Sequence, residues 1–246
     1  MGDKEYLGLA KVFRGKPRKM EEVSAAMVEV NNDLQAFLAQ PRLTKKYPGI
    51  LMIHEWWGLN DQIKSIAHIL AREGYVVLAP DLFNGRIATT AEEAKVNIKE
   101  NVGANTFPRL VSALQFLRSL HMVEPENVGS IGWCFGGGLS YLIGAEGRLQ
   151  AVVLYYGQLT DDRNVLNKLK SPILGIFGAE DTRPSSTEVQ RFEGVLKAQG
   201  TPIEVHIYDG AGHAFANPTQ TSRFRELQAK DAWTRTIDFL ARTLKA

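Results

Sequence analysis

Six short runs of nearly uninterrupted apolar residues divide this chain of 246 residues, and segments with helical periodicity lie between them. Runs of this length and composition are typical of strands that are buried on both faces of a parallel sheet. Their alternation with helices predicts an α/β fold in which helices cover both faces of a mostly parallel, doubly wound sheet. The predicted strands are residues 49–53, 75–79, 128–132, 151–155, 173–177 and 203–208.

An antiparallel hairpin is predicted ahead of these runs. Residues 25–30 and 34–39 alternate apolar and polar side chains, and the polar segment Asn31-Asn32-Asp33 joins them. Pro41 ends the second strand, because proline lacks the N–H that a strand ladder needs. With this N-terminal hairpin the sheet has about eight strands.

The segments between the strands carry helix start signals, in which a polar side chain accepts an otherwise unpartnered backbone N–H. Proline also suits the first position of a helix. The expected starts are Asn60 or Asp61, the capping pairs Thr90 with Glu93 and Ser185 with Glu188, and Pro108 ahead of residues 110–120; the last helix covers about residues 223–244.

Charge is distributed unevenly along the chain. Residues 1–20 hold six basic and two acidic side chains, a sum of +4, so the remainder sums to −2 and the formal net charge is +2. We therefore predict a basic N-terminal arm over residues 1–22 and a single domain over residues 23–246. Such an arm could touch nucleic acid or an anionic membrane. We favour a solvated terminus that lies on or beside the domain and expect no membrane partner. Because the remainder has no basic and aromatic stripe, we also expect no nucleic-acid partner.

A single cysteine, Cys134, excludes an intramolecular disulfide and a thiolate cluster for a metal. No apolar run reaches the roughly 18 residues that cross a bilayer, and the first residues lack the apolar core of a secretory signal. We therefore expect a cytoplasmic protein with a reduced cysteine. We also expect a monomer whose partner is a small molecule.

Cys134 lies in a glycine-rich segment between a predicted strand and a predicted helix. Gly132-Trp133-Cys134-Phe135-Gly136 is the G-x-S-x-G pattern with cysteine in place of serine. The glycines allow a sharp turn that exposes the middle side chain, and a helix N-terminus stabilises a thiolate. A lone cysteine is often an inert buried hydrophobe, but the glycines and the flanking elements favour a nucleophile here.

Two further residues follow predicted strands as a catalytic triad requires. Asp181 can orient a histidine and stabilise its charged form, although it could instead cap the next helix, and Glu180 and Asp209 are rivals for the role. His213 lies in a glycine-rich loop, where an imidazole can serve as base and acid. The chain order of nucleophile, acid and histidine is that of an α/β-hydrolase triad.

The loop that follows residues 49–53 is the last candidate. In the α/β-hydrolase fold this loop supplies one backbone N–H of the oxyanion hole, and the residue after the nucleophile supplies the other. The expected donors are the N–H groups of Trp56 and Phe135. From its residue type alone, Glu55 could be a catalytic carboxylate, an exposed charge or the partner of an arginine.

These motifs together resemble the dienelactone hydrolase family, the carboxymethylenebutenolidases, over about residues 25–245. The resemblance implies a cofactor-free hydrolase of carboxylic esters or lactones, with Cys134, Asp181 and His213 as its triad and a thioester on Cys134. It also implies that an anionic substrate shifts Glu55, and that Glu55 then accepts the thiol proton of Cys134. The segments that carry the resemblance are His54-Glu55-Trp56-Trp57-Gly58-Leu59-Asn60, Ala79-Pro80-Asp81-Leu82, Gly132-Trp133-Cys134-Phe135-Gly136-Gly137 and Gly212-His213-Ala214-Phe215.

The resemblance also implies substrate-binding residues. Family members that act on dienelactone hold its carboxylate with two arginines; Arg86 fits the first position, and Asn217 occupies the second. Losing one arginine removes a charge-assisted, bidentate contact and leaves the substrate open. We expect Trp57, Phe83 and Phe215 to complete the substrate-binding residues.

Two other functions compete with this one. The same fold could serve a non-catalytic protein that binds a small carbonyl ligand or senses oxidants through Cys134. A nucleic-acid role through Lys16-Pro17-Arg18-Lys19 ranks below the hydrolase and below this non-catalytic protein.

Overall fold

The computed structural model describes residues 21–42 and 45–245. The chain divides into two compact units, unit 1 (Met1–Val128) and unit 2 (Gly129–Ala246). Most of the predicted basic arm over residues 1–22 lies outside the described residues, so its role stays a prediction.

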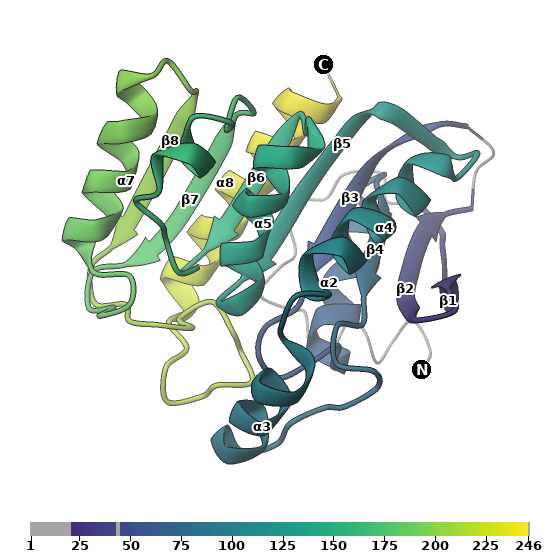
Figure 1. The fold of residues 1–246 in the computed structure, drawn as a ribbon, viewed down its shortest axis with the longest axis horizontal. Helices are drawn as coiled ribbons and strands as arrows, with labels where there is room; N and C mark the ends of the chain where they lie inside the picture. Colours follow the sequence, from purple (N-terminus) through teal and green to yellow (C-terminus); the bar gives the residue numbers. More distant parts are fainter. Residues whose placement is uncertain (1–20, 43–44, 246) are drawn as a thin grey trace. The chain divides into compact units, whose positions relative to one another are not determined.

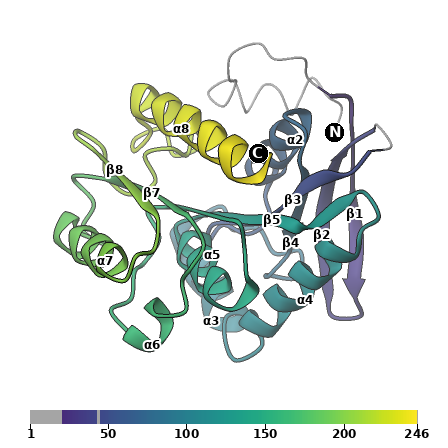
Figure 2. The same cartoon turned by 90° about the horizontal axis from the view of Figure 1, so that it is seen from above.

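Unit 1 contains the antiparallel hairpin and the first parallel strands (Figure 1). β2 pairs antiparallel with β1 on one side and with β4 on the other, and β4 pairs parallel with β3. Figure 2 shows α2 on one face of these strands and α4 on the other. The elements are β1 (Val23–Asn31), β2 (Leu34–Pro41), β3 (Tyr47–Ile53), α2 (Asp61–Arg72), β4 (Val76–Pro80), α3 (Ala91–Asn101) and α4 (Thr106–Ser119).

Unit 2 contains parallel strands in the order β5, β6, β7 and β8, and the first half of β5 belongs to unit 1. α5 and α7 cover one face of these strands and α8 covers the other (Figure 2). The elements are β5 (Val123–Trp133), α5 (Phe135–Gly147), β6 (Ala151–Tyr155), α6 (Arg163–Leu166), β7 (Ile173–Gly178), α7 (Ser186–Ala198), β8 (Ile203–Tyr208) and α8 (Glu226–Leu244).

The predicted fold class is confirmed, with eight strands that are mostly parallel and an N-terminal antiparallel hairpin. β6 and β8 have the predicted ends. β5 is the main difference, because it begins at Val123 rather than at residue 128. Residues 124–127 are polar, include a proline and are largely solvent-exposed, so they do not continue the apolar run that marks the buried half of the strand.

The predicted helix caps are confirmed at three starts. Asn60 accepts the N–H of Ile63 at 3.1 Å, and the pairs Thr90 with Glu93 and Ser185 with Glu188 form reciprocal capping boxes. Ser185 rather than Asp181 therefore caps α7, which leaves the Asp181 carboxylate available for another partner.

Two helix starts differ from the prediction. α4 begins at Thr106, so Pro108 is its third residue rather than its first. Proline is tolerated there because the first N–H groups of a helix have no partner within it. α8 begins at Glu226 rather than at residue 223, since turns that bond the N–H groups of Arg223 and Phe224 to the carbonyl of Gln220 precede it.

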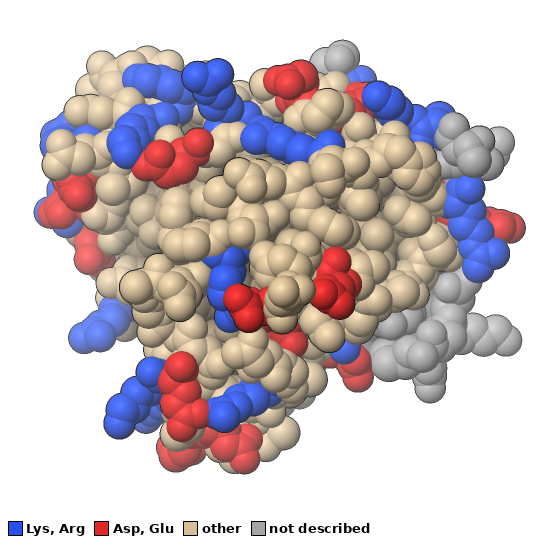
Figure 3. Space-filling view, turned by 45° about the vertical axis from the view of Figure 1, so that its right-hand side comes forward, with Lys and Arg blue, Asp and Glu red and all other residues tan. Residues whose placement is uncertain are grey.

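The described helices pack on the strands through one face. α8 buries Ala229, Trp233, Ile237, Leu240 and Leu244, as its spacing predicts, and exposes charged side chains between them. None of the described helices is both long and apolar enough to span a bilayer. On the face drawn in Figure 3, basic and acidic side chains lie beside one another rather than in separate fields.

Candidate active site

Cys134 occupies the sharp turn between β5 and α5. Its backbone has φ 53° and ψ −115°, a conformation that costs a residue with a side chain about 1–3 kcal/mol. Neighbouring backbone groups hold it in place: the Cys134 N–H donates to the carbonyl of Tyr155 at 3.0 Å, and the Gly138 N–H donates to the carbonyl of Cys134 at 3.2 Å. The strained turn expected from the glycine pattern is present.

Two glycines make this turn possible. A Cβ atom on Gly132 would collide with the carbonyl of Gly136, and one on Gly137 would lie 2.7 Å from the carbonyl oxygen of Tyr155. At Gly132 the strand before the turn and the helix after it therefore approach more closely than a side chain would allow, and at Gly137 the same helix approaches β6 as closely.

His213 connects Cys134 to Asp181. Its Nε2 atom lies 3.1 Å from Sγ of Cys134, and its Nδ1 atom lies 2.8 Å from Oδ2 of Asp181. The Asp181 side chain is 3% exposed, and its other oxygen accepts the N–H of Arg183 at 2.9 Å. Asp181, rather than its rivals Glu180 and Asp209, is thus the carboxylate bonded to the histidine.

The charge state of His213 follows from these contacts. Burial alone would lower the pKa of His213, but its hydrogen bonds to Asp181 and Cys134 and their negative charges raise the pKa to about 10. When Cys134 is a thiolate, the ring is therefore an imidazolium at neutral pH. A cation at hydrogen-bond distance from Sγ stabilises negative charge on that sulfur.

The sequence prediction missed one neighbour of this site, Tyr156. Its ring centre lies 5.2 Å from that of His213 and 5.8 Å from that of Phe215. The side chains of Tyr156 and Phe215 are fully buried. Tyr156 comes directly after β6 and has a positive φ of 37°. Its place at a strand end, shared with the other site residues, was the signal that could have found it.

Phe215 and Asn217 are fixed by their own surroundings. Phe215 packs between the rings of Tyr156 and Tyr208. Asn217 is buried, and its amide oxygen accepts the N–H and the hydroxyl of Thr219 at 3.0 and 2.8 Å. These contacts shape the loop that carries His213, and a role of either residue toward substrate stays a prediction.

The other predicted site residues in unit 1 lie on two loops. Glu55 is 3% exposed, and the rings of the half-buried Trp56 and Trp57 meet edge-on at 5.1 Å. Phe83 is fully buried, whereas Arg86 is exposed and forms an ion pair with Glu100 of α3. Phe135, the remaining oxyanion-hole candidate, is the first residue of α5 in unit 2.

His54 ties the two loops of unit 1 together. Its ring is buried, Nε2 accepts the N–H of Leu82 at 3.2 Å, and Nδ1 lies 2.6 Å from the carbonyl of Glu55. Because Nε2 accepts, Nδ1 must carry the proton and donate it. Burial lowers the pKa of His54, which keeps the ring in this neutral form. The sequence indicated only that His54 follows a strand.

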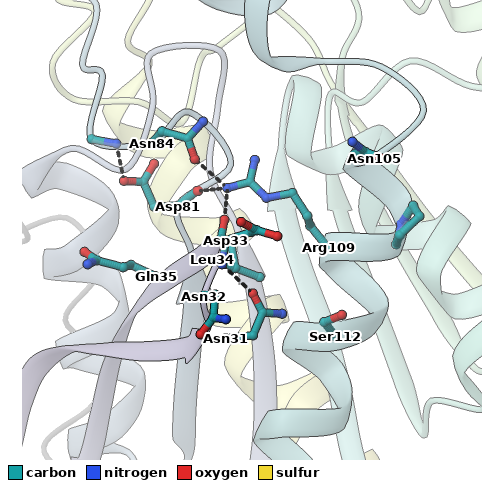
Figure 4. A pocket seen from close by; sticks show the side chains of 12 residues that line it. Asn31, Asn32, Asp33, Leu34, Gln35, Asp81, Asn84, Asn105, Arg109 and Ser112 are labelled. Atoms are coloured by element: carbon teal, nitrogen blue, oxygen red, sulfur yellow. Dashed lines mark hydrogen bonds between the residues drawn. The ribbon is translucent and has the colours of Figure 1, made fainter.

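Unit 1 also has a polar cavity of about 1110 Å³ between the β1–β2 turn, residues 81–85 and the start of α4 (Figure 4). Arg109 spans it and donates to the backbone carbonyls of Asp33, Asp81 and Leu82 at 3.0–3.2 Å, and to the side chain of Asn84 at 2.8 Å. No residue of the Cys134 site lines this cavity. Its hydrogen bonds fasten the hairpin to the segment that follows β4.

Comparison with known proteins identifies the family of this chain. The model of the dienelactone hydrolase family matches residues 34–244. The chain belongs to the dienelactone hydrolase family. Membership confirms the predicted family and the predicted enzyme class, a hydrolase of carboxylic esters or lactones.

Similar proteins come from distant sources. A protein of Saccharolobus solfataricus named "Putative carboxymethylenebutenolidase" is 30% identical over 86% of this chain and 95% of its own length. A dienelactone hydrolase-like promiscuous phosphotriesterase from metagenomic libraries has a TM-score of 0.82 at 21% identity, covering 90% of this chain and 98% of that one. The Pyrococcus horikoshii acylaminoacyl peptidase has a TM-score of 0.70 at 18% identity, covering 92% of this chain and 42% of that one. The two structures show that the chain has the α/β-hydrolase fold.

Proposed function

We propose that this dienelactone hydrolase family member hydrolyses small carboxylic esters or lactones through a thioester on Cys134. The observation that carries the proposal is the hydrogen-bonded series from Asp181 through His213 to Sγ of Cys134. Within the described residues, no group of three or more His, Cys, Asp or Glu side chains could hold a metal ion.

Acylation begins at the sulfur. The Cys134 thiolate attacks the carbonyl carbon of the substrate, and backbone N–H groups, with those of Phe135 and Trp56 as our candidates, stabilise the oxyanion. The imidazolium of His213 then gives its Nε2 proton to the departing alkoxide oxygen, and a thioester remains on Cys134. Asp181 holds the ring in the required orientation throughout.

Deacylation needs His213 as a base, which requires a lower pKa of its ring. Acylation of Cys134 itself lowers that pKa. Once the sulfur carries an acyl group, it no longer contributes the negative charge that helps to raise the pKa of His213. Burial then acts against a smaller opposing effect, so the pKa falls. The neutral ring accepts a proton from water, which attacks the thioester and releases the acid.

Glu55 is the proposed first acceptor of the thiol proton when substrate binds, and Arg86 the proposed contact for a substrate carboxylate. Support for the first proposal is the burial of Glu55 and the hydrogen bonds that hold its loop through His54. Trp57, Phe83, Phe215 and Asn217 stay candidates for shaping the substrate site. A monomeric, cytoplasmic protein without nucleic-acid or membrane partners also stays a prediction.

The test uses para-nitrophenyl acetate and a dienelactone as substrates. We expect kcat/KM to fall at least about 10³-fold in Cys134→Ala and about 10²–10⁴-fold in His213→Ala, with circular dichroism unchanged. Mass spectrometry of the quenched wild-type reaction should show an acyl adduct on the peptide that contains Cys134. His121→Ala is the matched control, since His121 is exposed and is no part of the proposed triad.

Full turnover by Cys134→Ala or by His213→Ala would refute the proposed mechanism. A wild-type protein that acylates with none of these substrates and whose thiol reacts reversibly with peroxide would favour the competing role as an oxidant sensor.

A further inference from the structure

A second cavity, of about 450 Å³, lies beside His213 in unit 2. It is formed by the loop after β7 and the loop between β8 and α8, and we name it the arginine cavity. Its lining includes His213 and Asp181 together with Arg183, Arg223, Arg225 and Glu180. A volume of this size accommodates a small organic group.

Two of these arginines have guanidinium groups available for a ligand. Arg183 and Arg223 are exposed, and neither side chain forms an ion pair or hydrogen bond with any part of the chain that the structure describes. The charge of Arg183 acts on the carboxylate of Glu188 in α7, which does not line the cavity. Arg225 differs, because its guanidinium donates to the carbonyls of Gly210, Ser222 and Phe224 at 3.0–3.1 Å. Arg225 therefore fixes the loop that presents Arg223.

The acidic residues of the cavity do not cancel this charge. Asp181 is committed to His213 and to the N–H of Arg183, and its side chain is almost fully buried. Glu180 is exposed and is the one free carboxylate among the described lining residues. Two available guanidinium groups against one carboxylate favour an anion, and the hydroxyls of Thr182 and Ser222 add neutral donors to the same lining.

The position of His213 indicates which part of a substrate would lie here. In the proposed mechanism its Nε2 proton goes to the oxygen that leaves, so the leaving oxygen must lie within hydrogen-bond reach of that nitrogen. Groups attached to the leaving oxygen then extend from His213 into the space around it. The arginine cavity is lined by this same residue and by Asp181, and Cys134 is not among its described lining residues.

We propose that the arginine cavity binds the leaving-group side of an ester whose alcohol part carries a carboxylate or a phosphate, held by Arg183 and Arg223. This proposal rests on the proposed function. The S–C bond forms and the C–O bond to the alcohol breaks, while the alcohol oxygen takes the proton of His213. The anionic alcohol then leaves with its charge unchanged, and water later replaces the sulfur on the acyl group.

The test compares esters that differ in where the charge lies. para-Acetoxybenzoate and para-acetoxyphenyl phosphate carry it on the leaving group, para-acetoxybenzamide carries none, and monophenyl succinate carries it on the acyl group. We expect Arg183→Gln and Arg223→Gln each to lower kcat/KM for the first two esters by about fivefold, the effect of one partly exposed ion pair. Rates with the other two esters should not change.

Two further variants sharpen this comparison. Glu180→Gln removes the opposing carboxylate, so it should raise kcat/KM for the esters with a charged leaving group by about twofold. Arg191→Gln is the matched control. It also removes an arginine from unit 2, but Arg191 lies on α7, pairs with Asp161 at 3.7 Å and does not line the arginine cavity.

Direct binding separates this proposal from the proposed function. Calorimetry with the Cys134→Ala variant should show binding of para-hydroxybenzoate and of para-hydroxyphenyl phosphate that is weakened about fivefold by Arg183→Gln or Arg223→Gln. Preference for one of the two compounds distinguishes a carboxylate site from a phosphate site.

Three results would overturn the arginine cavity as a leaving-group site. They are an equal loss of activity toward all four esters in Arg183→Gln and Arg223→Gln, an effect confined to monophenyl succinate, and binding that neither substitution weakens. Cys134→Ala that still hydrolyses the neutral ester would instead overturn the proposed function, and the binding measurement would then decide the anion site by itself.

Discussion

In the proposed mechanism two neighbours control the proton on His213, and only one of them keeps its charge through a turnover. Asp181 is buried and bonded to Nδ1, and no chemical step alters it. Cys134 lies at Nε2, and the proposed acylation would remove its negative charge. Both neighbours raise the pKa of His213 against the effect of burial. His213 has to act first as an acid and then as a base. Asp181 keeps the ring oriented in both steps, whereas the change at Cys134 lowers the pKa of His213 between them.

Asp181→Asn tests this residue-scale account through the pH dependence of stability. The folded-state pKa of His213 is raised from 6.5 to about 10, so its contribution to the free energy of unfolding is fully present below pH 6.5. That contribution is lost as the pH rises through about 10. Asp181→Asn removes one cause of the raised pKa, so its free energy of unfolding should fall less than that of the wild type over this range.

Urea denaturation at a series of pH values measures the difference, and an NMR titration of the His213 ring measures the pKa directly. Equal pH dependence in wild type and variant would show that Asp181 does not set the charge of His213.

At the scale of elements, local signals were sufficient for the glycine turn and for the positions of Cys134 and His213 after strand ends. Cys134 and His213 each follow a strand and lie next to glycines, so neighbouring residues identify them. Tyr156 has the same local signal, its place directly after β6, but the role of His54 could not be predicted in this way, because it depends on a partner far along the chain. The N–H that His54 accepts belongs to Leu82, 28 residues away. The first half of β5 was missed for a different reason, since its exposed polar residues carry no apolar pattern.

Gly137→Ala tests the close approach between α5 and β6. The new methyl group would lie 2.7 Å from the carbonyl oxygen of Tyr155 and 3.0 Å from Cα of Gly157, and both are backbone atoms. We expect the free energy of unfolding in urea to fall by about 1–3 kcal/mol, as in other overpacked interiors.

Gly194→Ala in α7 is the control for this substitution, because nothing lies within 4 Å of its new methyl group. It should stabilise the protein by about 0.5–1 kcal/mol through helix propensity. Equal effects of the two substitutions would contradict the packing argument.

At the scale of the whole molecule, β5 belongs to both compact units. Residues 123–128 lie in unit 1 and residues 129–133 in unit 2, so the division falls within one continuous strand. A strand shared in this way couples the folding of the two units, because neither unit has all of β5 without the other. We therefore keep the prediction of a single domain over residues 23–246.

Differential scanning calorimetry tests that prediction. We expect one transition with a ratio of calorimetric to van't Hoff enthalpy of about 1, as for a two-state protein. Fluorescence of the tryptophans in unit 1 and unit 2 and far-ultraviolet circular dichroism should give the same midpoint. Two resolved transitions, or midpoints that differ between probes, would show that the units unfold separately.

The backbone at Cys134 sets the proposed catalytic role of this residue against the stability of the folded protein. At φ 53° and ψ −115° a glycine would relieve about 1–3 kcal/mol of conformational cost, which outweighs the roughly 0.5–1 kcal/mol by which glycine's freedom favours the unfolded chain. Directed evolution for heat resistance alone would thus accept glycine at this position and yield a more stable protein that lacks the Cys134 thiol. Engineering of this scaffold for durability therefore has to screen for turnover at every round.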